Sequence, residues 1–418
     1  MYIMIRGKKE IFMGLNDTPS SERIHIGIFG RRNAGKSSLM NAITGQQTAV
    51  VSDIAGTTTD PVRKAMELLP LGPVLLIDTP GIDDVGELGG KRVEKARQIL
   101  RQSDIAILVV DAVSGKNSDD TELLALFEKM GVPHITVYNK CDLVPPADSR
   151  RLKEVNPDEI YVSAVTGENI YELKERAAHV LKTDGEKLRI VADLLKPADF
   201  AVLVVPIDKA APKGRLILPQ QQTIRDILDA GATAVVVREH EFRETLNSLG
   251  KRPGMVITDS QVFAKVSAET PPDIPLTSFS ILFARYRGIL NTAVKGALEL
   301  GKISDDDRIL IAEGCTHHRQ CDDIGTVKLP RFIQQFTGKT PEFSFTSGGE
   351  FPDNLTPYKL IVHCGACMLN DREMKYRERE SASQGVPFTN FGILIARTQG
   401  ILKRSISPFS HLSADFED

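Results

Sequence analysis

The sequence lacks three features that would place it in a special class. It has only five cysteines, no excess of basic residues (net charge −3), and no apolar run of membrane-spanning length. The charge balance argues against a general nucleic-acid binder, and the missing apolar run argues against a membrane protein. Residues 1–10 also lack the apolar core of a signal peptide. We therefore expect a cytoplasmic protein with neither a membrane nor a nucleic-acid partner.

The bulk composition is that of an ordinary globular protein with more than one domain. Hydrophobic residues make up 41% and charged residues 26% of the chain, and both values are typical of soluble proteins. A length of 418 residues predicts two or three domains. Met13 could be the natural start, which would leave the first residues as a dispensable tail.

The most specific motif lies near the N-terminus. An apolar stretch at 24–29 reads as a buried strand, and G-x-x-x-x-G-K-S follows it directly, before a predicted helix at 38–43. In such a loop the backbone N–H groups surround phosphates, the lysine reaches the β- and γ-phosphates, and the serine binds Mg²⁺. The residues that we expect at the nucleotide here are Gly30, Asn33, Ala34, Gly35, Lys36, Ser37 and Ser38.

Two further motifs follow in the order that a GTPase requires. The predicted strand at 74–77 ends in Asp78-Thr-Pro-Gly81, and Gly56-Thr-Thr-Thr-Asp60 precedes it. We expect Thr58 to contact Mg²⁺, Asp78 to lie just outside the metal ligands, and Gly81 to sense the γ-phosphate. Lys36, Thr58, Asp78 and Gly81 are thus the candidate catalytic residues.

The base-binding motifs predict guanine. A predicted strand at 135–138 runs into the N-K-x-D sequence, and another at 160–162 runs into Ser-Ala. An aspartate at the end of N-K-x-D accepts from two donors of guanine that adenine does not offer. The candidate base-binding residues are Asn139, Lys140, Asp142, Ser163 and Ala164. Cys141, in the variable slot, reads as a small buried hydrophobe.

Two details narrow the kind of GTPase. Asn33, together with the G-T-T element, resembles the Era/TrmE branch, in which this asparagine helps to hold K⁺. Ile82 follows Gly81, so the water-orienting glutamine of Ras-like proteins is missing. We expect slow intrinsic hydrolysis that K⁺ could stimulate. In the alternative interpretation, Asn33 only braces the loop.

The middle of the chain predicts a small parallel α/β domain. After a helix at 170–182 and a linker at 183–187, predicted strands and helices alternate. The strands are at 201–206, 233–237 and 255–258, and the helices are at 220–230, at about 239–249 and from 260 onward. This segment shows no catalytic constellation, and it suits a dimerisation module, joined edge to edge.

The last third contains three of the five cysteines in one pattern. Cys315-x-His317 and His363-Cys364-x-x-Cys367 are separated by 45 residues. Each group follows a predicted strand, at 308–312 and at 358–362. If these strands are parallel neighbours, both groups lie at the sheet edge where α/β proteins bind ligands. Disulfides are disfavoured in a reducing cytosol, so the cysteines are better interpreted as metal ligands or redox groups.

Iron–sulfur fits this ligand set better than zinc. Zinc sites usually have paired ligands on both arms, whereas the first arm here is Cys-x-His. Three thiolates with one open iron suit a 4Fe-4S cluster that exchanges its fourth ligand. Candidates for the fourth position are His317, His363, Cys321, a residue of another chain, or solvent.

The chain resembles the FeFe-hydrogenase maturation GTPases, the HydF family. The residues that carry the resemblance are Arg23–Gly30, Gly56–Pro61, the Gly314-Cys315-Thr-His317 sequence and the His363-Cys364-Gly-Ala-Cys367 sequence. The resemblance implies an α/β protein of three domains: a P-loop GTPase domain (1–184), a small parallel dimerisation domain (185–272) and a cluster-binding domain (273–418).

The resemblance also implies a function. Members act as GTP-hydrolysing scaffolds or carriers that bind a 4Fe-4S cluster and form a homodimer or higher oligomer. They receive a diiron precursor built with two radical-SAM maturases and pass it to the apo FeFe-hydrogenase. The alternative is an RNA- or ribosome-associated Era-like GTPase with an accessory zinc module. That class should carry an RNA-binding unit or a basic face, and the sequence shows neither.

Overall fold

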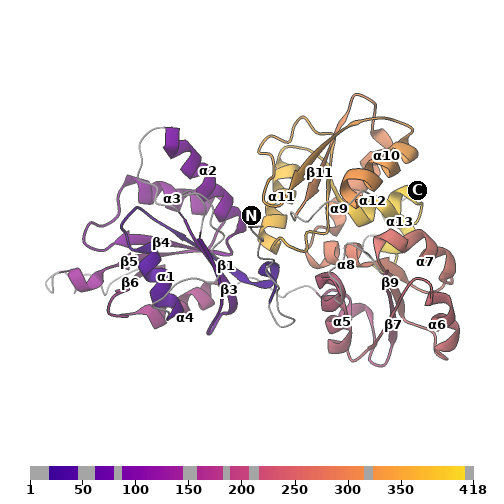
Figure 1. Cartoon of the computed structure of the whole chain (residues 1–418), viewed down its shortest axis with the longest axis horizontal. Coiled ribbons are helices and arrows are strands. Elements are labelled where there is room, and N and C mark those ends of the chain that lie inside the picture. Colours follow the sequence, from indigo (N-terminus) through magenta and orange to yellow (C-terminus); the bar gives the residue numbers. More distant parts are fainter. Residues whose placement is uncertain are drawn as a thin grey trace, which may run out of the picture. The chain divides into compact units, whose positions relative to one another are not determined.

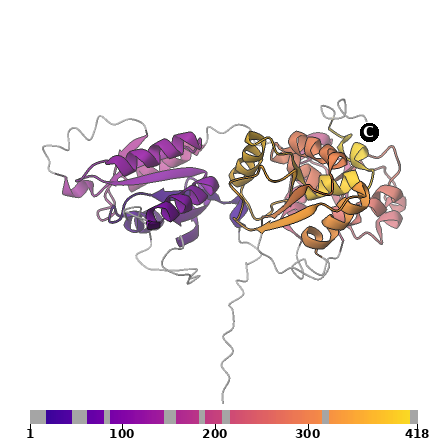
Figure 2. The ribbon, with the colours of Figure 1, turned by 90° about the horizontal axis from the view of Figure 1, so that it is seen from above.

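The computed structural model describes residues 18–45, 62–79, 87–144, 158–181, 189–206, 216–314 and 323–409, with the side chains of 87–93 left out. The chain divides into two compact units, 1–184 and 185–418, and each is described by itself (Figures 1 and 2). No helix in these residues is both long and apolar enough to cross a membrane.

Unit 1 contains a six-stranded sheet in the order β2-β3-β1-β4-β5-β6. All neighbours are parallel except β2 and β3, which are antiparallel. The strands are β1 Ile24–Phe29, β2 Val62–Leu68, β3 Gly72–Asp78, β4 Ile105–Asp111, β5 His134–Asn139 and β6 Glu159–Tyr161. The helices are α1 Lys36–Thr44, α2 Glu87–Gln102, α3 Ser118–Lys129 and α4 Ile170–Leu181.

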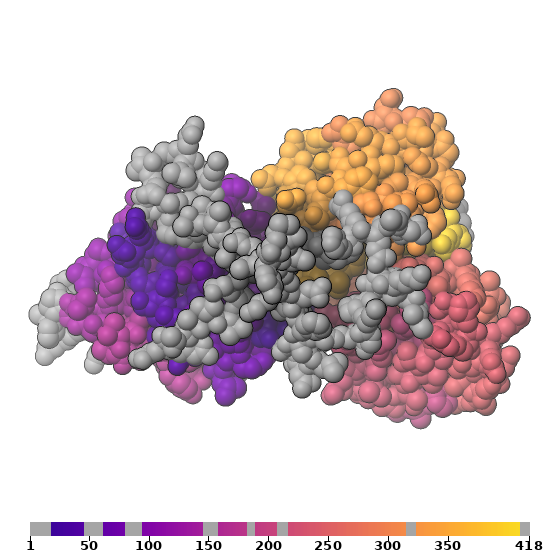
Figure 3. Space-filling model, in the orientation of Figure 1, coloured from indigo at the N-terminus to yellow at the C-terminus, as the bar shows by residue number. Residues whose placement is uncertain are grey.

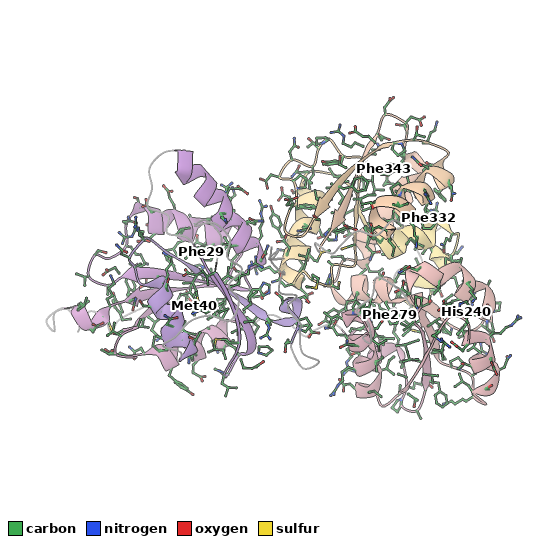
Figure 4. All side chains as sticks on the ribbon, in the orientation of Figure 1. Phe29, Met40, His240, Phe279, Phe332 and Phe343 are labelled. Carbon is green, nitrogen blue, oxygen red and sulfur yellow. The ribbon has the colours of Figure 1, made fainter. Side chains whose placement is uncertain are left out.

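Two apolar layers hold this sheet between its helices. Successive side chains of a strand point to opposite faces, and β1 shows this alternation. Ile26 and Ile28 pack in the cluster that includes α1 and α4, whereas Phe29 packs in the cluster that includes α2 and α3. Figure 4 labels Phe29 and, on α1, Met40, which belong to these two layers. A sheet buried on both faces is the expected support for a parallel P-loop fold.

Unit 2 contains two four-stranded parallel sheets. The first is β10-β9-β7-β8 and the second is β12-β11-β13-β14. The strands of the first are β7 Phe200–Val204, β8 Thr233–Val237, β9 Met255–Thr258 and β10 Leu276–Ser278. Those of the second are β11 Arg308–Glu313, β12 Glu342–Ser347, β13 Leu360–His363 and β14 Phe388–Asn390.

Nine α-helices accompany the two sheets in the described part of unit 2. They are α5 Leu218–Asp229, α6 Phe242–Ser248, α7 Phe263–Glu269, α8 Phe279–Tyr286, α9 Leu290–Leu298, α10 Leu329–Thr337, α11 Asp371–Ser383, α12 Phe391–Thr398 and α13 Leu402–Ile406. A π-helical turn at Ile324–Lys328 precedes α10.

The two sheets have the same topology. Numbered by their order in the chain, the strands of each sheet follow the order 2-1-3-4. In such a sheet the connections leave in opposite directions from strands 1 and 3, and ligands bind where these two strands end. That point is the end of β7 and β9 in the first sheet, and of β11 and β13 in the second.

A sequence repeat accompanies the repeated topology. Residues 275–290, PLTSFSILFARYRGIL, align with residues 387–402, PFTNFGILIARTQGIL, with ten of sixteen positions identical. Each copy forms the fourth strand and the following helix, β10–α8 and β14–α12. Ser278 and Asn390 occupy the same cap position, and each accepts a backbone N–H three residues on. The repeat indicates an internal duplication within unit 2.

Unit 2 has two halves, the first with the sheet β7–β10 and the second with the sheet β11–β14, and they share an apolar core. A single cluster runs from Ile190 to Phe409 through both sheets and includes Phe279 on α8, labelled in Figure 4. The two halves exchange their last helices: α9, which follows α8, packs against β14 of the second sheet, and α13, which follows α12, packs against β10 of the first. The orange and rose halves abut in the space-filling view (Figure 3). The halves therefore depend on each other for their folding.

The predicted α/β fold class is confirmed. The strands expected at 24–29, 233–237 and 255–258 have these bounds, and the other expected strands and helices are present with ends shifted by a few residues. Strands β2, β4, β10, β12 and β14 and the internal duplication were not predicted from the sequence. The three domain boundaries stay a prediction.

Candidate functional site

The phosphate loop has a backbone that its glycines make possible. Gly30 and Gly35 have φ of 137° and 93°, values that side chains with a Cβ rarely adopt. A Cβ on Gly35 would also collide with the side-chain amide of Asn139. Gly35 caps α1, so the loop leads into the helix N-terminus, where free N–H groups favour an anion.

Lys36 and Ser37 begin α1 and face the loop. The Lys36 ammonium is buried and donates to the carbonyls of Gly30 and Arg31 over 2.8 and 2.7 Å. The Ser37 hydroxyl donates to Oδ2 of Asp78 over 2.9 Å. These contacts bring three of the predicted phosphate and Mg²⁺ residues to one place at the ends of β1 and β3.

Asp78 has features that suit a site beside a cation. Its Oδ1 is buried and has no hydrogen-bond partner among the residues that the structure describes. Burial raises the pKa of Asp78, while the Ser37 hydrogen bond and the Lys36 charge lower it. A buried carboxylate oxygen without a partner costs free energy, and Mg²⁺ ligated by a neighbouring hydroxyl would offset that cost.

Asn139 connects the phosphate loop to the predicted base-binding loop. Its Nδ2 donates to the Ala34 carbonyl over 3.1 Å, and its Oδ1 accepts from the Ala164 N–H over 3.0 Å. Ser163 is buried, and its hydroxyl accepts from the N–H of Thr166. This asparagine therefore holds the two loops in register.

The residues that follow Asn139 in the N-K-x-D motif leave the Asp142 carboxylate accessible. Lys140 has φ of 66°, and its ammonium lies 2.6 Å from Asp111 Oδ2. Asp142 lies in the short 3₁₀ turn Cys141–Leu143 and is exposed to solvent. Cys141 is half-buried beside Glu168, and burial raises the pKa of its thiol to about 11. Such a thiol is protonated and unreactive at neutral pH.

Asn33 is exposed and has φ of 63°. Asparagine tolerates this left-handed conformation better than most residues do. The backbone thus gives a structural reason for asparagine here, independent of any cation. Thr58 and Gly81, the other two predicted catalytic residues, lie outside the described residues.

The predicted cysteine strands are parallel neighbours. Strand β11 pairs with β13, with Ala312 opposite His363, and both strands end at the switch point of the second sheet. The N–H of Gly314 donates to Sγ of Cys364 over 3.0 Å. Cys315 follows Gly314 in the chain, but Cys315, His317 and Cys321 lie outside the described residues.

The Cys364–Cys367 turn surrounds its first sulfur with N–H donors. Ala366 has φ of 53°, and its N–H also donates to Cys364 Sγ, over 3.3 Å. Burial raises the pKa of Cys364 to about 11, and these hydrogen bonds lower it only in part. Burial also raises the pKa of Cys367, which the charge of Arg287 opposes. Two N–H donors aimed at one sulfur favour a thiolate or metal-bound sulfur over a neutral thiol.

His363 is completely buried, and both of its ring nitrogens have partners. Nδ1 lies 2.9 Å from the Cys364 carbonyl oxygen, and Nε2 lies 3.0 Å from Nη1 of Arg377. Nδ1 must therefore carry the proton, and Nε2 accepts. Burial, followed by the Arg377 charge, lowers the pKa of His363 to about 3. In this arrangement neither nitrogen is available to a metal.

Two buried arginines next to the cysteine turn escaped the sequence analysis. Arg377 on α11 is fully buried and binds Glu373 and the Gly348 carbonyl as well as His363. Arg287, which follows α8, donates to carbonyls of the turn itself. One available signal was the 275–290 repeat, in which Arg287 stands where the second copy has Gln399.

Three family models match the chain in succession. Residues 25–140 match the 50S ribosome-binding GTPase family. Residues 190–288 match the hydrogen maturase F dimerization domain, and residues 291–408 match the hydrogen maturase F tetramerization domain. Arg287 belongs to the dimerization match and the cysteine turn to the tetramerization match.

Similar proteins share the GTPase part. GTPase Der of Kosmotoga olearia is 32% identical over 216 residues, 48% of each chain. The tRNA modification GTPase MnmE of Nitrosomonas europaea is 35% identical over 174 residues, 41% of this chain and 37% of MnmE. The chain thus spans less than half the length of these relatives. A structure of Aquifex aeolicus Era bound to GDP and AlF₄⁻ is 23% identical, with a TM-score of 0.31, and the match covers 54% of this chain and 98% of Era.

Proposed function

We propose, from the HydF-like architecture that this chain has, that it is a GTP-hydrolysing maturation protein of FeFe-hydrogenase. A GTPase domain followed by the two hydrogen maturase F domains carries this proposal. In it, the chain holds a 4Fe-4S cluster through Cys315, Cys364 and Cys367. It receives a diiron precursor from radical-SAM maturases and delivers it to the apo-hydrogenase.

GTP and Mg²⁺ fit the residues of unit 1. The amides of the phosphate loop would bind the phosphates, and Lys36 would exchange its two carbonyl contacts for phosphate oxygens. Ser37 would turn its hydroxyl oxygen to Mg²⁺, near the unpartnered oxygen of Asp78. Mg²⁺ neutralises charge that develops on the phosphates. Asp142 would select guanine, and Asn33 would contribute to a K⁺ site beside the phosphates.

A cluster fits the cysteine turn. Cys364 offers a sulfur that already accepts two backbone N–H bonds, as sulfurs of Fe–S clusters commonly do. The raised pKa of the Cys364 thiol means that metal binding would release a proton. An iron–sulfur cluster supplies an iron with an exchangeable ligand, to which a precursor can attach.

His363 is the weaker candidate for the fourth ligand. Ligation through Nε2 would leave the buried Arg377 guanidinium without its acceptor, and ligation through Nδ1 would cost the bond to the Cys364 carbonyl. We therefore propose that His317, Cys321, a residue of another chain or solvent occupies this position, and that His363 supports the turn.

The two hydrogen maturase F domains support assembly into dimers and tetramers. Strand β8 is an edge strand of the first sheet, which suits the expected edge-to-edge dimer. The apo-hydrogenase and the radical-SAM maturases are proposed as the protein partners, and the cytoplasm as their location.

Anaerobic purification of the full chain, followed by iron, sulfide and zinc analysis, tests this proposal. We expect a brown protein with about four iron atoms per chain and an EPR signal after reduction. Such a protein should also activate apo-hydrogenase together with the maturases. A colourless protein with stoichiometric zinc would contradict the proposal and favour the RNA-associated GTPase.

A further inference from the structure

Arg287 reaches from one half of unit 2 into the other. It follows α8 of the first half, and its guanidinium donates to the carbonyls of Gly365 and Ala366, over 2.9 Å each. A third bond, over 3.3 Å, goes to the Leu369 carbonyl. The side chain is only 8% exposed, and Nε lies 3.3 Å from the Asp371 carboxylate.

These contacts fix the direction of the peptide units between the cysteines. In a trans peptide the C=O and N–H point to opposite sides. The Gly365 carbonyl points to Arg287, and the N–H of the same peptide, that of Ala366, points to Cys364 Sγ. The Ala366 carbonyl also points to Arg287, which turns the N–H of Cys367 the other way. One guanidinium thus orients two consecutive peptides with their N–H groups toward the sulfur side.

The same contacts hold a conformation that is unfavourable by itself. Ala366 has φ of 53°, and a residue with a Cβ is strained in this left-handed region. A planar guanidinium suits two converging carbonyls, because its donors form a fixed fork. The guanidinium also brings a positive charge to the Cys364–Cys367 turn.

We propose that Arg287 is a positioning residue for the cluster site: it sets the peptide orientation of the Cys364–Cys367 turn and thereby links the pairing of the two halves to the cluster. This inference rests on the proposed function, since it assumes a metal bound to these sulfurs. N–H···S bonds and nearby positive charge both stabilise the reduced cluster. Loss of Arg287 should therefore lower the reduction potential and loosen the turn.

Arg404 provides a matched control. It belongs to α13 of the second half and donates to the carbonyls of Ser267, Thr270 and Pro271 in the first half, over 2.7–2.8 Å. It makes the same kind of contact between halves, but at the end of α7, where no cysteine is present. Arg404→Gln removes a comparable link without touching the cysteine turn.

The experiment compares Arg287→Gln, Arg287→Lys and Arg404→Gln with the wild type in the full chain, after anaerobic cluster reconstitution. Glutamine is the residue that the second repeat has at this position. Three quantities are measured: the reduction potential, the rate of iron loss to EDTA, and the thermal midpoint.

We expect Arg287→Gln to change the equilibrium constant for one-electron reduction of the cluster at least tenfold, which lowers the reduction potential by about 59 mV. The variant should also lose iron to EDTA at least tenfold faster. Arg287→Lys keeps the charge but not the fork, so it should lose iron faster with a smaller potential shift. Arg404→Gln should lower the thermal midpoint and leave both iron readouts unchanged.

The positioning role is overturned if Arg287→Gln matches Arg404→Gln in potential and iron loss. Should Arg287→Gln fail to fold, Arg287→Lys decides, and wild-type iron loss in that variant overturns the inference. A wild-type protein that takes up no iron overturns the proposed function and this inference together, whereas iron-loaded variants indistinguishable from the wild type overturn this inference alone.

Discussion

The backbone N–H of Gly314 donates to Sγ of Cys364 over 3.0 Å, across 50 residues of sequence. This bond joins the end of β11 to the end of β13, the two strands that flank the switch point of the second sheet. Cys315 follows Gly314 directly, so the chain delivers its third candidate thiolate from this strand end. The parallel pairing of β11 and β13 therefore brings Gly314 and Cys364, 50 residues apart in sequence, to one edge of the sheet.

Cys364→Ser should abolish the iron–sulfur signal, because a serine oxygen is a harder donor than a thiolate and poorly replaces it on iron. Cys315→Ser and Cys367→Ser should do the same. Iron content and EPR after anaerobic reconstitution measure the effect, and GTP turnover should persist in all three variants. Cys141→Ser is the control, because Cys141 lies in unit 1 beside Glu168. Iron loss in that variant would point to a site of different composition.

Much of this picture follows from local sequence signals. The phosphate loop and N-K-x-D each lie where a strand ends, and the strand at 255–258 lies between Pro-Gly and Asp-Ser, so its limits are plain. Strand β2 was missed because three charged residues interrupt its short sequence, VRKAMEL, and it is a mostly exposed edge strand. Edge strands need less apolar surface, so periodicity detects them poorly.

The supports of the cysteine turn could not be read from local patterns. Arg377 lies in the charged helix sequence DREMKYRERESAS, where an arginine normally faces solvent. Its burial depends on His363 and Glu373 converging from β13 and α11. Arg287 similarly acts 78 residues away in sequence. Both sets of contacts become visible only in the three-dimensional structure, those of Arg377 within the second half and those of Arg287 between the halves.

Lys36→Ala should abolish GTP turnover and leave the iron content unchanged. The Lys36 ammonium donates to the Gly30 and Arg31 carbonyls of the phosphate loop. Phosphate oxygens would compete with these carbonyls for its N–H donors. Phosphate release measures GTP turnover, and iron analysis of the same preparation measures the iron content. Simultaneous loss of iron would show that the two units do not fold independently.

Arg377→Met should destabilise unit 2 by about 3–5 kcal/mol, because it leaves the buried carboxylate of Glu373 without its partner. Hydrogen exchange of the backbone amides of β13 in the full chain measures this loss directly. Arg225→Met is the control, since the Arg225 side chain is 78% exposed in its pair with Asp229 and an exposed pair contributes little. Equal exchange rates in the two variants would mean that Arg377 contributes no more than a surface pair.

Asp142→Asn should weaken the preference for GTP over other purine nucleotides, because the variant loses a carboxylate that accepts from two guanine donors. The carboxylate is exposed, so the substitution should not affect folding. Competition between GTP and xanthosine triphosphate, whose base presents the opposite hydrogen-bonding pattern at position 2, measures the effect. Unchanged discrimination would exclude Asp142 as the base reader.

Asn33 offers a test that separates a cation role from a backbone role. If its side chain contributes to a K⁺ site, replacement of K⁺ by Na⁺ should slow GTP hydrolysis severalfold in the wild type. Asn33→Gly keeps the left-handed backbone at φ 63° accessible but removes the amide, so the K⁺ dependence should disappear. Asn33→Ala removes the amide and also strains the loop, so it should bind GTP more weakly than Asn33→Gly does. Rates in K⁺ and Na⁺, measured at saturating GTP, check this prediction. If Asn33→Gly retains the wild-type K⁺ stimulation, asparagine is present for its backbone conformation alone.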